Sequence, residues 1–294
     1  MTECLSCPLC GQGHYGTSAE QAKVASNVRR WTAHRFTVWR CPLCGSLHRL
    51  EEVDIAPYYQ GYPYGQRKLD GFTRKVFRHY LKRLIRHGLT SDSRILDYGC
   101  SQGLLLEYLR ETGYPHVFGY DPYTPGYDDA SVMEQPFDVV IAQDVIEHVE
   151  DPDALFDILV HATRPEGLIC IGTPCADAVD LARPQASLHS LHLPYHKHIL
   201  SERALIEAGS RHGLSLESLE RRHSCDTPYP FVNWTFLKAY IESGDNTLDA
   251  GFDPPRILSV MTSPKLWAYG LLGYWLPVGS EMIALFRKPS ARTS

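Results

Sequence analysis

The ten residues RILDYGCSQG, at positions 94–103, decide the fold. They join a short apolar strand that ends at Asp97 to a glycine-rich turn, and a helix is predicted directly after them over residues 104–110. Such a turn lets a ligand approach the backbone, and the N-terminus of the helix favours an anionic group. A second predicted strand ends 24 residues later at Asp121, where a carboxylate can accept hydrogen bonds from ribose hydroxyls. Turn, spacing and carboxylate together indicate a cofactor that contains a nucleoside.

The chain beyond this turn alternates predicted strands and helices. Strands are expected at residues 116–120, 137–142, 168–172, 214–219 and 281–287, and helices at residues 153–163 and 201–212. The strands are continuous apolar runs, which is typical of a parallel sheet covered on both faces. The sequence therefore predicts an α/β, Rossmann-like fold, interrupted by an aromatic and proline-rich insert at residues 226–279 just before the last strand.

Three segments, in this order, resemble the motifs of class I S-adenosylmethionine (SAM)-dependent methyltransferases. LDYGCSQG resembles the first motif of that family, FDVVIAQDVIEHV at residues 137–149 resembles its fourth-strand motif, and RPEGLICIGTP at residues 164–174 resembles its fifth strand. The resemblance covers residues 91–225 and 280–290 and implies SAM as the cofactor. In it Asp97, Gly99 and Gly103 hold the methionine end of SAM and Asp121 binds the ribose, whereas Ser101 stands where the family has its middle glycine. The cofactor-binding set so implied is Asp97, Gly99, Cys100, Ser101, Gly103, Asp121, Pro122, Gln143 and Asp144.

The five-residue word CPLCG occurs twice near the start of the chain, at residues 7–11 and 41–45. Two residues between the cysteines let both thiolates reach one ion, and the glycine frees the backbone to turn around it. The words predict a structural zinc ribbon, with iron as the alternative occupant and reduced surface thiols as the alternative without metal. Cys4 could compete as a ligand. The predicted ligands are Cys7, Cys10, Cys41 and Cys44. The odd total of nine cysteines argues against a disulfide framework.

The segment LHSLHLPYHKHILS, residues 188–201, brings four histidines to the edge of the sheet where this family places its acceptor. Within it, PYHKHILS resembles the Tyr-His-Glu-His segment of zinc-ribbon sugar C-methyltransferases, and the resemblance assigns a catalytic pair to Tyr195 and His198. Lys197 replaces the Glu of that segment, which looks one residue shorter here, and no counterpart of that family's further C-terminal domain is expected. These departures leave O-methylation open.

A hydroxyl or an acidic carbon as acceptor needs a base, and histidine suits this task because its pKa lies near neutrality. His148, on the loop after the fourth strand, is therefore a third catalytic candidate. Other roles stay open for these histidines: His148 as a cap of the following helix, His198 as a packing residue, and the cluster as a metal site.

Three regions are expected along the chain. They are a zinc ribbon at residues 1–56, a linker with a basic helix at residues 57–90, and the SAM-dependent domain at residues 91–290. The linker contains PYYQGYPYG, whose prolines and glycines predict irregular structure, with its tyrosines packed between domains or forming a lid over a pocket.

Charge is divided unevenly between the two parts of the chain. Residues 1–95 carry 15 Lys and Arg against seven Asp and Glu, whereas residues 96–294 carry 14 against 27. This asymmetry indicates that the first third faces a phosphate, a nucleotide or the protein's own second half, or that its basic helix presents a solvated face.

Length and composition, with 294 residues of which 44% are apolar and 21% charged, are those of a folded globular protein. The start of the sequence lacks the pattern of a signal peptide and no apolar stretch is long enough to span a bilayer, so a cytoplasmic enzyme or binding protein is expected. The leading hypothesis is a methyltransferase acting on a small polar acceptor such as a sugar, nucleotide-sugar or natural-product intermediate, and the basic first third would suit a phosphorylated one. The alternatives are an RNA methyltransferase that grips phosphates with the ribbon and basic helix, and a non-catalytic zinc-ribbon adaptor. The sequence argues against nucleic acid, because its pI is 6.3, and leaves the methylated atom and the oligomeric state open.

Overall fold

The computed structural model describes residues 6–12, 20–60, 62–63 and 68–290. Its main feature is a six-stranded sheet in the order β5-β4-β6-β7-β10-β9. The strands are β4 (Ile95–Tyr98), β5 (Val117–Tyr120), β6 (Phe137–Gln143), β7 (Thr163–Pro174), β9 (Ser215–Glu220) and β10 (Glu281–Arg287). The four strands β5, β4, β6 and β7 pair in parallel, as expected. The last strand differs from the all-parallel expectation, because β10 returns between β7 and β9 and pairs antiparallel with both.

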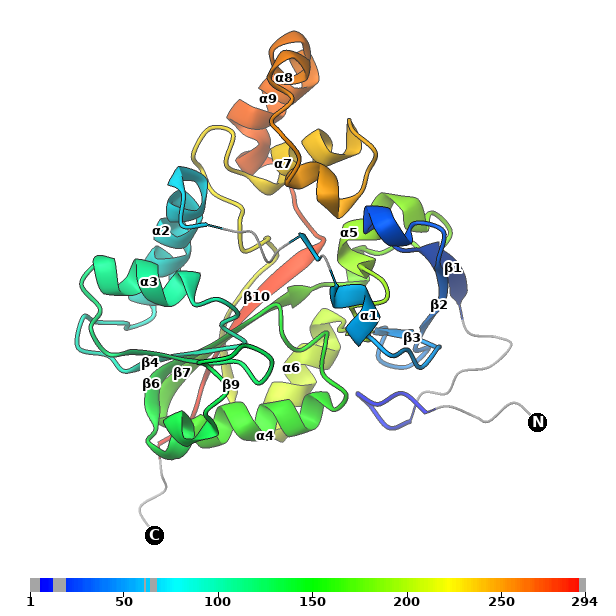
Figure 1. Cartoon of the computed structure of the whole chain (residues 1–294). Helices are drawn as coiled ribbons and strands as arrows, with labels where there is room; N and C mark the ends of the chain where they lie inside the picture. The colour runs from blue at the N-terminus through cyan, green and yellow to red at the C-terminus, as the bar shows by residue number, and fades with distance from the viewer. Residues whose placement is uncertain (1–5, 13–19, 61, 64–67, 291–294) are drawn as a thin grey trace.

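Helices cover both faces of this sheet (Figure 1). One face packs against α2 (Gly71–Arg86) and α3 (Leu104–Glu111), and the other against α4 (Pro152–Ala162) and α6 (Glu202–Arg211). The side chains of each strand alternate between the two layers. In β10, for example, Ile283 and Leu285 join the cluster under α2 and α3, whereas Ala284 and Phe286 join the cluster under α4 and α6. Every inner strand is buried on both sides, and the predicted α/β fold is confirmed.

The helices begin at polar caps that the sequence supplies. Asp70 accepts a hydrogen bond from the backbone N–H of Thr73 and begins α2, and Asp151 does the same for Asp153 and Ala154 in α4. The basic helix therefore starts four residues later than the apolar periodicity from residue 67 suggests.

A second, four-stranded sheet lies beside the first, in the order β1-β2-β3-β8. We call it the N-terminal sheet; its strands are β1 (Gln21–Ala25), β2 (Arg35–Arg40), β3 (Leu47–Arg49) and β8 (His198–Ile199). All its neighbouring strands pair antiparallel. Because β8 comes from the region expected to form the SAM-dependent domain, this sheet crosses the boundary expected at residue 56.

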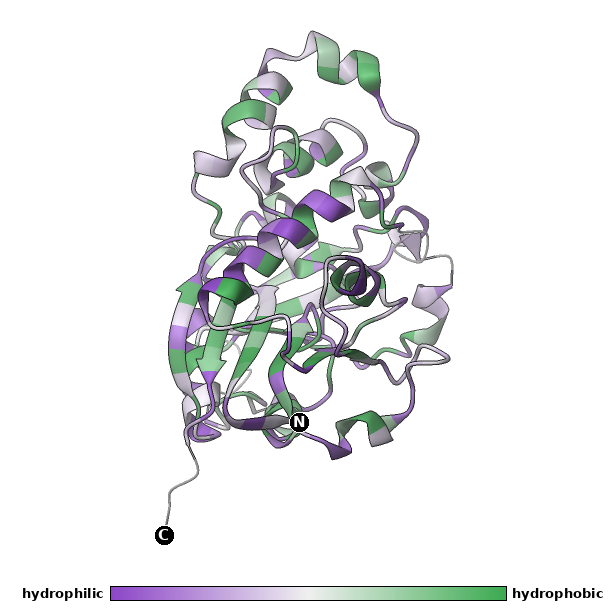
Figure 2. Ribbon diagram, turned by 90° about the vertical axis from the view of Figure 1, so that its left-hand side faces the viewer, coloured by the Kyte–Doolittle hydropathy of each residue, from purple (hydrophilic) through white to green (hydrophobic). Residues whose placement is uncertain are grey.

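The insert between β9 and β10 is helical and protrudes from the edge of the sheet (Figures 1 and 2). It holds α7 (Trp234–Glu242), α8 (Ile257–Thr262) and α9 (Pro264–Leu272). Several large apolar side chains there are exposed: Ile257, Leu258, Met261, Trp267, Leu271, Leu272 and Trp275. Among the described residues, no helix combines the length and apolarity needed to cross a bilayer.

Shorter elements complete the fold. In the linker, α1 (Ala56–Tyr59) forms one helical turn where irregular structure was expected, and Tyr64 and Gly65 lie outside the described residues. The helix α5 (Leu188–Leu191) precedes β8. Turns of 3₁₀ helix form at Arg29–Trp31, Ala130–Glu134, Ala176–Ala178, Pro184–Ser187, Leu248–Gly251 and Gly273–Trp275.

The basic residues of the first third find acidic partners in the second part of the chain. Arg83, which is 1% exposed on α2, lies 2.8 Å from the Glu220 carboxylate. Arg29 pairs with Asp245 and Asp253 of the insert, 2.6 Å from each. The structure therefore supports one interpretation of the charge asymmetry, in which the basic first third faces the protein's own second half.

Candidate functional site

The glycine turn after β4 lies at the carboxyl end of the parallel strands, where open α/β sheets bind their ligands. Gly99 has φ +79° and Gly103 has φ +75°, in the left-handed region that favours glycine. A Cβ atom on Gly99 would lie 2.4 Å from Cγ2 of Val145, so this position admits no side chain. Ser101 also has a positive φ, +48°. The serine thus adopts a left-handed conformation that glycine adopts readily, at a cost of about 1–2 kcal/mol.

Asp97 and Asp121 stand on either side of this turn, at the ends of the neighbouring strands β4 and β5. The carboxylate of Asp121 accepts a hydrogen bond from the backbone N–H of Ser101 and another from that of Tyr123, each at 2.9 Å. Asp97 is buried, and its burial, followed by the charge of Asp121, raises its pKa from 3.8 to about 7. The turn therefore carries two acidic groups at the positions where the sequence predicts the methionine and ribose ends of SAM.

The residues at the end of β6, Gln143 and Asp144, form a further part of the site. Gln143 donates from Nε2 to Oδ1 of Asp144 at 2.7 Å, while its Oε1 is buried and has no hydrogen-bond partner among the described residues. Asp144 has φ +56°, and its N–H donates to the carbonyl oxygen of Gly172 on β7. Cys100 is buried and burial raises its pKa to about 12, so it is a neutral thiol, and Pro122 is exposed on the loop after β5.

These features fit a bound SAM. An orphaned, buried acceptor such as Gln143 Oε1 is costly unless a donor reaches it. The two acidic side chains can take the positive amino group and the ribose hydroxyls of the cofactor.

Three histidines gather at the loop that follows β6, and we call them the histidines behind β6: His148, His192 and His196. The ring centroids of His148 and His196 are 4.9 Å apart, and those of His192 and His196 are 5.0 Å apart. Nδ1 of His148 donates to the carbonyl oxygen of Tyr195 at 3.0 Å, and Nδ1 of His196 donates to that of Ser190 at 2.8 Å. Burial lowers the pKa of all three imidazoles, so they are neutral near pH 7.

Glu147 lies among these histidines and was given no role by sequence reasoning. Its Oε2 accepts a hydrogen bond from Thr173 at 3.0 Å, and its buried Oε1, 4.0 Å from Nε2 of His196, has no hydrogen-bond partner in the described part of the chain. Burial, with Asp144 nearby, raises the pKa of Glu147 well above its usual range. The available signal was a carboxylate directly before His148 on the loop that follows a buried strand.

The tyrosines of the linker pack against Tyr195. The rings of Tyr59 and Tyr62 lie 5.2 Å and 4.7 Å from it, and the hydroxyl of Tyr195 donates to the carbonyl oxygen of Tyr58 at 2.7 Å. Burial, followed by Tyr123, Glu147 and Asp121, raises the pKa of Tyr59 to about 12. Tyr59 thus lies within electrostatic range of Glu147 and Asp121, a position that only the packing of the linker on Tyr195 discloses.

His198 lies elsewhere, inside the N-terminal sheet. Its Nδ1 is 3.0 Å from Nδ1 of His48, and Nε2 of His48 is 3.2 Å from Sγ of Cys7. Burial, followed by His48, lowers the pKa of His198 to about 3. The structure does not bring His198 into contact with Tyr195's hydroxyl or with the histidines behind β6, and its catalytic role stays a prediction.

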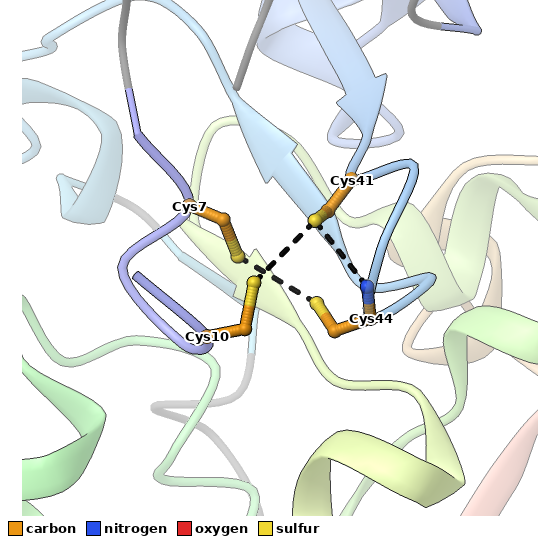
Figure 3. Close-up of side chains that lie close together, drawn as sticks. All are labelled: Cys7, Cys10, Cys41 and Cys44. Carbon is orange, nitrogen blue, oxygen red and sulfur yellow. Dashed lines mark hydrogen bonds between the residues drawn. The ribbon is translucent and has the colours of Figure 1, made fainter. Parts of the chain in front are cut away.

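The four predicted metal ligands converge at one point (Figure 3). The sulfurs of Cys7, Cys10, Cys41 and Cys44, which we call the thiol cluster, all lie within 4.8 Å of one another. Cys7 and Cys44 are 3.6 Å apart, and Cys10 and Cys41 are 3.7 Å apart. Four sulfurs about 2.3 Å from a central ion would be about 3.8 Å apart in a tetrahedron. The spacing therefore fits a closed thiolate site, and Cys4 lies outside the described residues.

The two CPLCG words fold alike around the cluster. The N–H of Gly11 donates to the carbonyl oxygen of Cys7, and that of Gly45 to Cys41, at 2.9 and 3.0 Å. The second turn is also joined to the main domain, because Ser201 donates from Oγ to the carbonyl oxygen of Cys44 while capping α6.

Comparison with known proteins places the chain in a family. A family model described as a methyltransferase domain matches residues 69–219. The ubiquinone biosynthesis O-methyltransferase of Xylella fastidiosa (strain M23) is 28% identical in an alignment of 151 residues that covers 43% of this chain; the chain spans only 60% of the length of that relative.

Similar solved structures include a SAM-dependent methyltransferase from Archaeoglobus fulgidus, at 18% identity and a TM-score of 0.46, with 79% of this chain and 99% of that one covered. Another is the 1,6-didemethyltoxoflavin-N1-methyltransferase of Burkholderia thailandensis, at 14% identity and a TM-score of 0.45, with 92% and 100% covered. The family model of the methyltransferase domain matches just over half of the chain, and the matched residues include the glycine turn. The chain therefore belongs to the family of methyltransferase domains.

Proposed function

We propose that this protein is a SAM-dependent methyltransferase that modifies a small polar acceptor, such as a sugar, a nucleotide-sugar or a natural-product intermediate. The observation that carries the proposal is the pair Asp97 and Asp121 around a glycine turn at the carboxyl ends of β4 and β5. Membership of the methyltransferase family and the orphaned acceptor of Gln143 support it.

The residues of the turn would hold SAM by its two polar ends. Asp97 would pair with the amino group of the methionine end, and Asp121 would accept from the ribose hydroxyls, beside Gln143 and Asp144. When bound, SAM supplies a methyl group on a positively charged sulfur, from which transfer is an in-line displacement. Catalysis by this chain is then mostly the alignment of acceptor and cofactor.

His148 is the residue that we assign to the removal of the acceptor's proton. It follows the cofactor-side residues Gln143 and Asp144 on the same loop, and because its Nδ1 donates to Tyr195, its Nε2 carries the free lone pair. A hydroxyl acceptor agrees with the O-methyltransferase relative. A phosphorylated acceptor stays an untested part of the proposal.

SAM is expected to bind more weakly as the pH is lowered through the pKa of Asp97, which is about 7. Below that pH the carboxyl is neutral and cannot pair with an ammonium group, so the dissociation constant should rise roughly tenfold from about pH 8 to about pH 6. Isothermal titration calorimetry across this range measures the change. Asp97→Asn should bind weakly at every pH, and an affinity of the native protein that does not vary with pH would contradict the assignment.

His148→Asn should bind SAM normally and lose turnover by about 10²–10⁴-fold, which is the usual contribution of acid–base assistance. Asparagine keeps a donor for the Tyr195 carbonyl but lacks the acceptor nitrogen. Turnover is measured as S-adenosylhomocysteine released with a panel of hydroxylated acceptors.

The exposed His161→Asn, on α4, is the matched control and should turn over normally. His198→Asn tests the competing assignment, because a true base at His198 would show the loss there and spare His148→Asn.

The thiol cluster is proposed to hold a structural zinc ion. Four thiolates leave no open coordination position, so this metal would stabilise the fold and take no part in the chemistry. Native mass spectrometry of the purified protein, with and without SAM, tests both proposals together: we expect one zinc and one SAM per chain. Zinc without any SAM adduct would favour the non-catalytic adaptor instead.

A further inference from the structure

A second group of metal-ligating side chains lies behind β6, apart from the thiol cluster. Glu147, His148 and His196 each offer a donor atom within 4.8 Å of the other two. Glu147 and His148 come from the loop after β6 and His196 from the segment before β8, so two separate segments converge on one point. Glu147 is fully buried, and 7% of His196 is exposed.

The hydrogen bonds of the two histidines fix where their lone pairs are. A backbone carbonyl oxygen can only accept, so the Nδ1 atoms of His148 and His196, bonded to the carbonyls of Tyr195 and Ser190, must carry the proton. The Nε2 atoms are then unprotonated acceptors. Metal-binding histidines are held in this way by an acceptor on their other nitrogen.

The carboxylate adds a third acceptor to the group. Oε2 of Glu147 accepts from Thr173, while the buried Oε1 lies 4.0 Å from Nε2 of His196 and has no hydrogen-bond partner among the residues that the structure describes. A separation of 4.0 Å between these two atoms is too long for a hydrogen bond. Donor atoms bound at about 2.1 Å to one tetrahedral ion lie about 3.4 Å apart, so a modest closure would seat an ion. His192 is excluded as a ligand, because its two nitrogens are occupied by Asn27 and Tyr62.

We propose that Glu147, His148 and His196 bind a divalent cation such as Zn²⁺, Fe²⁺ or Mn²⁺. Two imidazoles and one carboxylate are the donor set that these ions accept, and three protein ligands leave positions open, as in catalytic rather than structural sites. The inference rests on the proposed function in one respect: the expected occupant of an open position is the acceptor's oxygen. With Nε2 bound to the cation, His148 would act as a ligand in place of a direct base: the cation would lower the pKa of the hydroxyl that it holds, and the proton would leave to water.

Mn²⁺ alone is the probe, added to the full-length protein with its thiol-bound metal in place. Mn²⁺ prefers oxygen and nitrogen ligands and does not displace zinc from thiolates. We expect one additional Mn²⁺ per chain by electron paramagnetic resonance, with spin-echo modulation from histidine ¹⁴N. Glu147→Gln should weaken its binding at least about 100-fold, since even outer-shell changes cost 10–100-fold.

Glu150→Gln, an exposed carboxylate on the same loop, is the matched control and should bind Mn²⁺ as the native protein does. If Glu147→Gln fails to fold, His148→Asn makes the same test at a more exposed position. Absence of a second ion in the native protein, or equal binding by the triad variant and the control, would overturn the inference. SAM binding is titrated separately, without added cation, so that the two proposals can fail independently. SAM binding without Mn²⁺ binding rejects the cation site alone. Mn²⁺ binding without SAM binding rejects the methyltransferase proposal alone.

Discussion

A double variant, Cys41→Ser and Cys44→Ser, is expected to lose the proposed zinc ion and to destabilise the main domain together with the N-terminal sheet. Structural zinc contributes about 10–16 kcal/mol of apparent binding free energy, which is as large as the whole stability of a typical domain. Three of the thiol-cluster sulfurs belong to the same apolar cluster as Leu200 and Leu205 of the main domain. We expect an unfolding transition that is absent or lowered by tens of degrees, measured by circular dichroism alongside metal content.

Cys225→Ser is the matched control for this experiment. It removes a buried thiol outside the cluster, and the expected change in the unfolding midpoint is small. Hydrogen exchange should locate the damage, with lost protection in β8 and at the start of α6 as well as in β3. Normal protection of β8 and α6 in the double variant would show that the thiol cluster stabilises only the first part of the chain.

Asp121→Ala is expected to abolish measurable SAM binding, with the dissociation constant raised at least about 100-fold. Hydrogen bonds to a charged group contribute about 1.5–3 kcal/mol each, and the ribose offers two hydroxyls to this carboxylate. The change also removes the acceptor for the N–H of Ser101, which helps to hold that residue at a positive φ. Calorimetric titration with SAM measures the loss.

Two further variants separate these contributions. Asp121→Asn keeps an oxygen for the Ser101 N–H but loses the charge, so it should bind between the native protein and the alanine variant. Asp128→Ala, on the same loop and exposed, should bind SAM normally. An Asp121→Ala protein with native affinity would reject the ribose assignment and leave the glycine turn without its proposed ligand.

Much of the main domain could be predicted because its signals are local. The continuous apolar strands and the glycine turn depend on neighbouring residues, and β4, β6 and α4 fall within a few residues of their expected bounds. The direction of β10 could not be read in this way, because an apolar strand has the same composition whether it runs parallel or antiparallel. Its direction depends on where the insert leads the chain.

The acceptor side was harder to predict because it depends on pairing between distant segments. The strand β8 has only two residues, too few for any periodicity, yet its pairing with β3 turns His198 toward His48 and away from the histidines behind β6. His196, two residues earlier, faces Glu147 instead. Sequence alone ranked these neighbouring histidines by resemblance, whereas the chain bends at Lys197 between them and only His198 belongs to β8, so the two side chains have different surroundings.

The pairing of β3 with β8 also sets an order in which the protein can be made. His48 and His198 are 150 residues apart, so the N-terminal sheet stays incomplete until most of the chain has left the ribosome. The two CPLCG words emerge early, and a metal bound there would hold the first strands together. The edge of β3 would stay unpaired until β8 has been made. Such a distant partner slows folding and leaves an unpaired edge exposed to other nascent chains. A fragment that ends before residue 198 would keep that edge permanently open, and it should aggregate even with its thiols fully metallated.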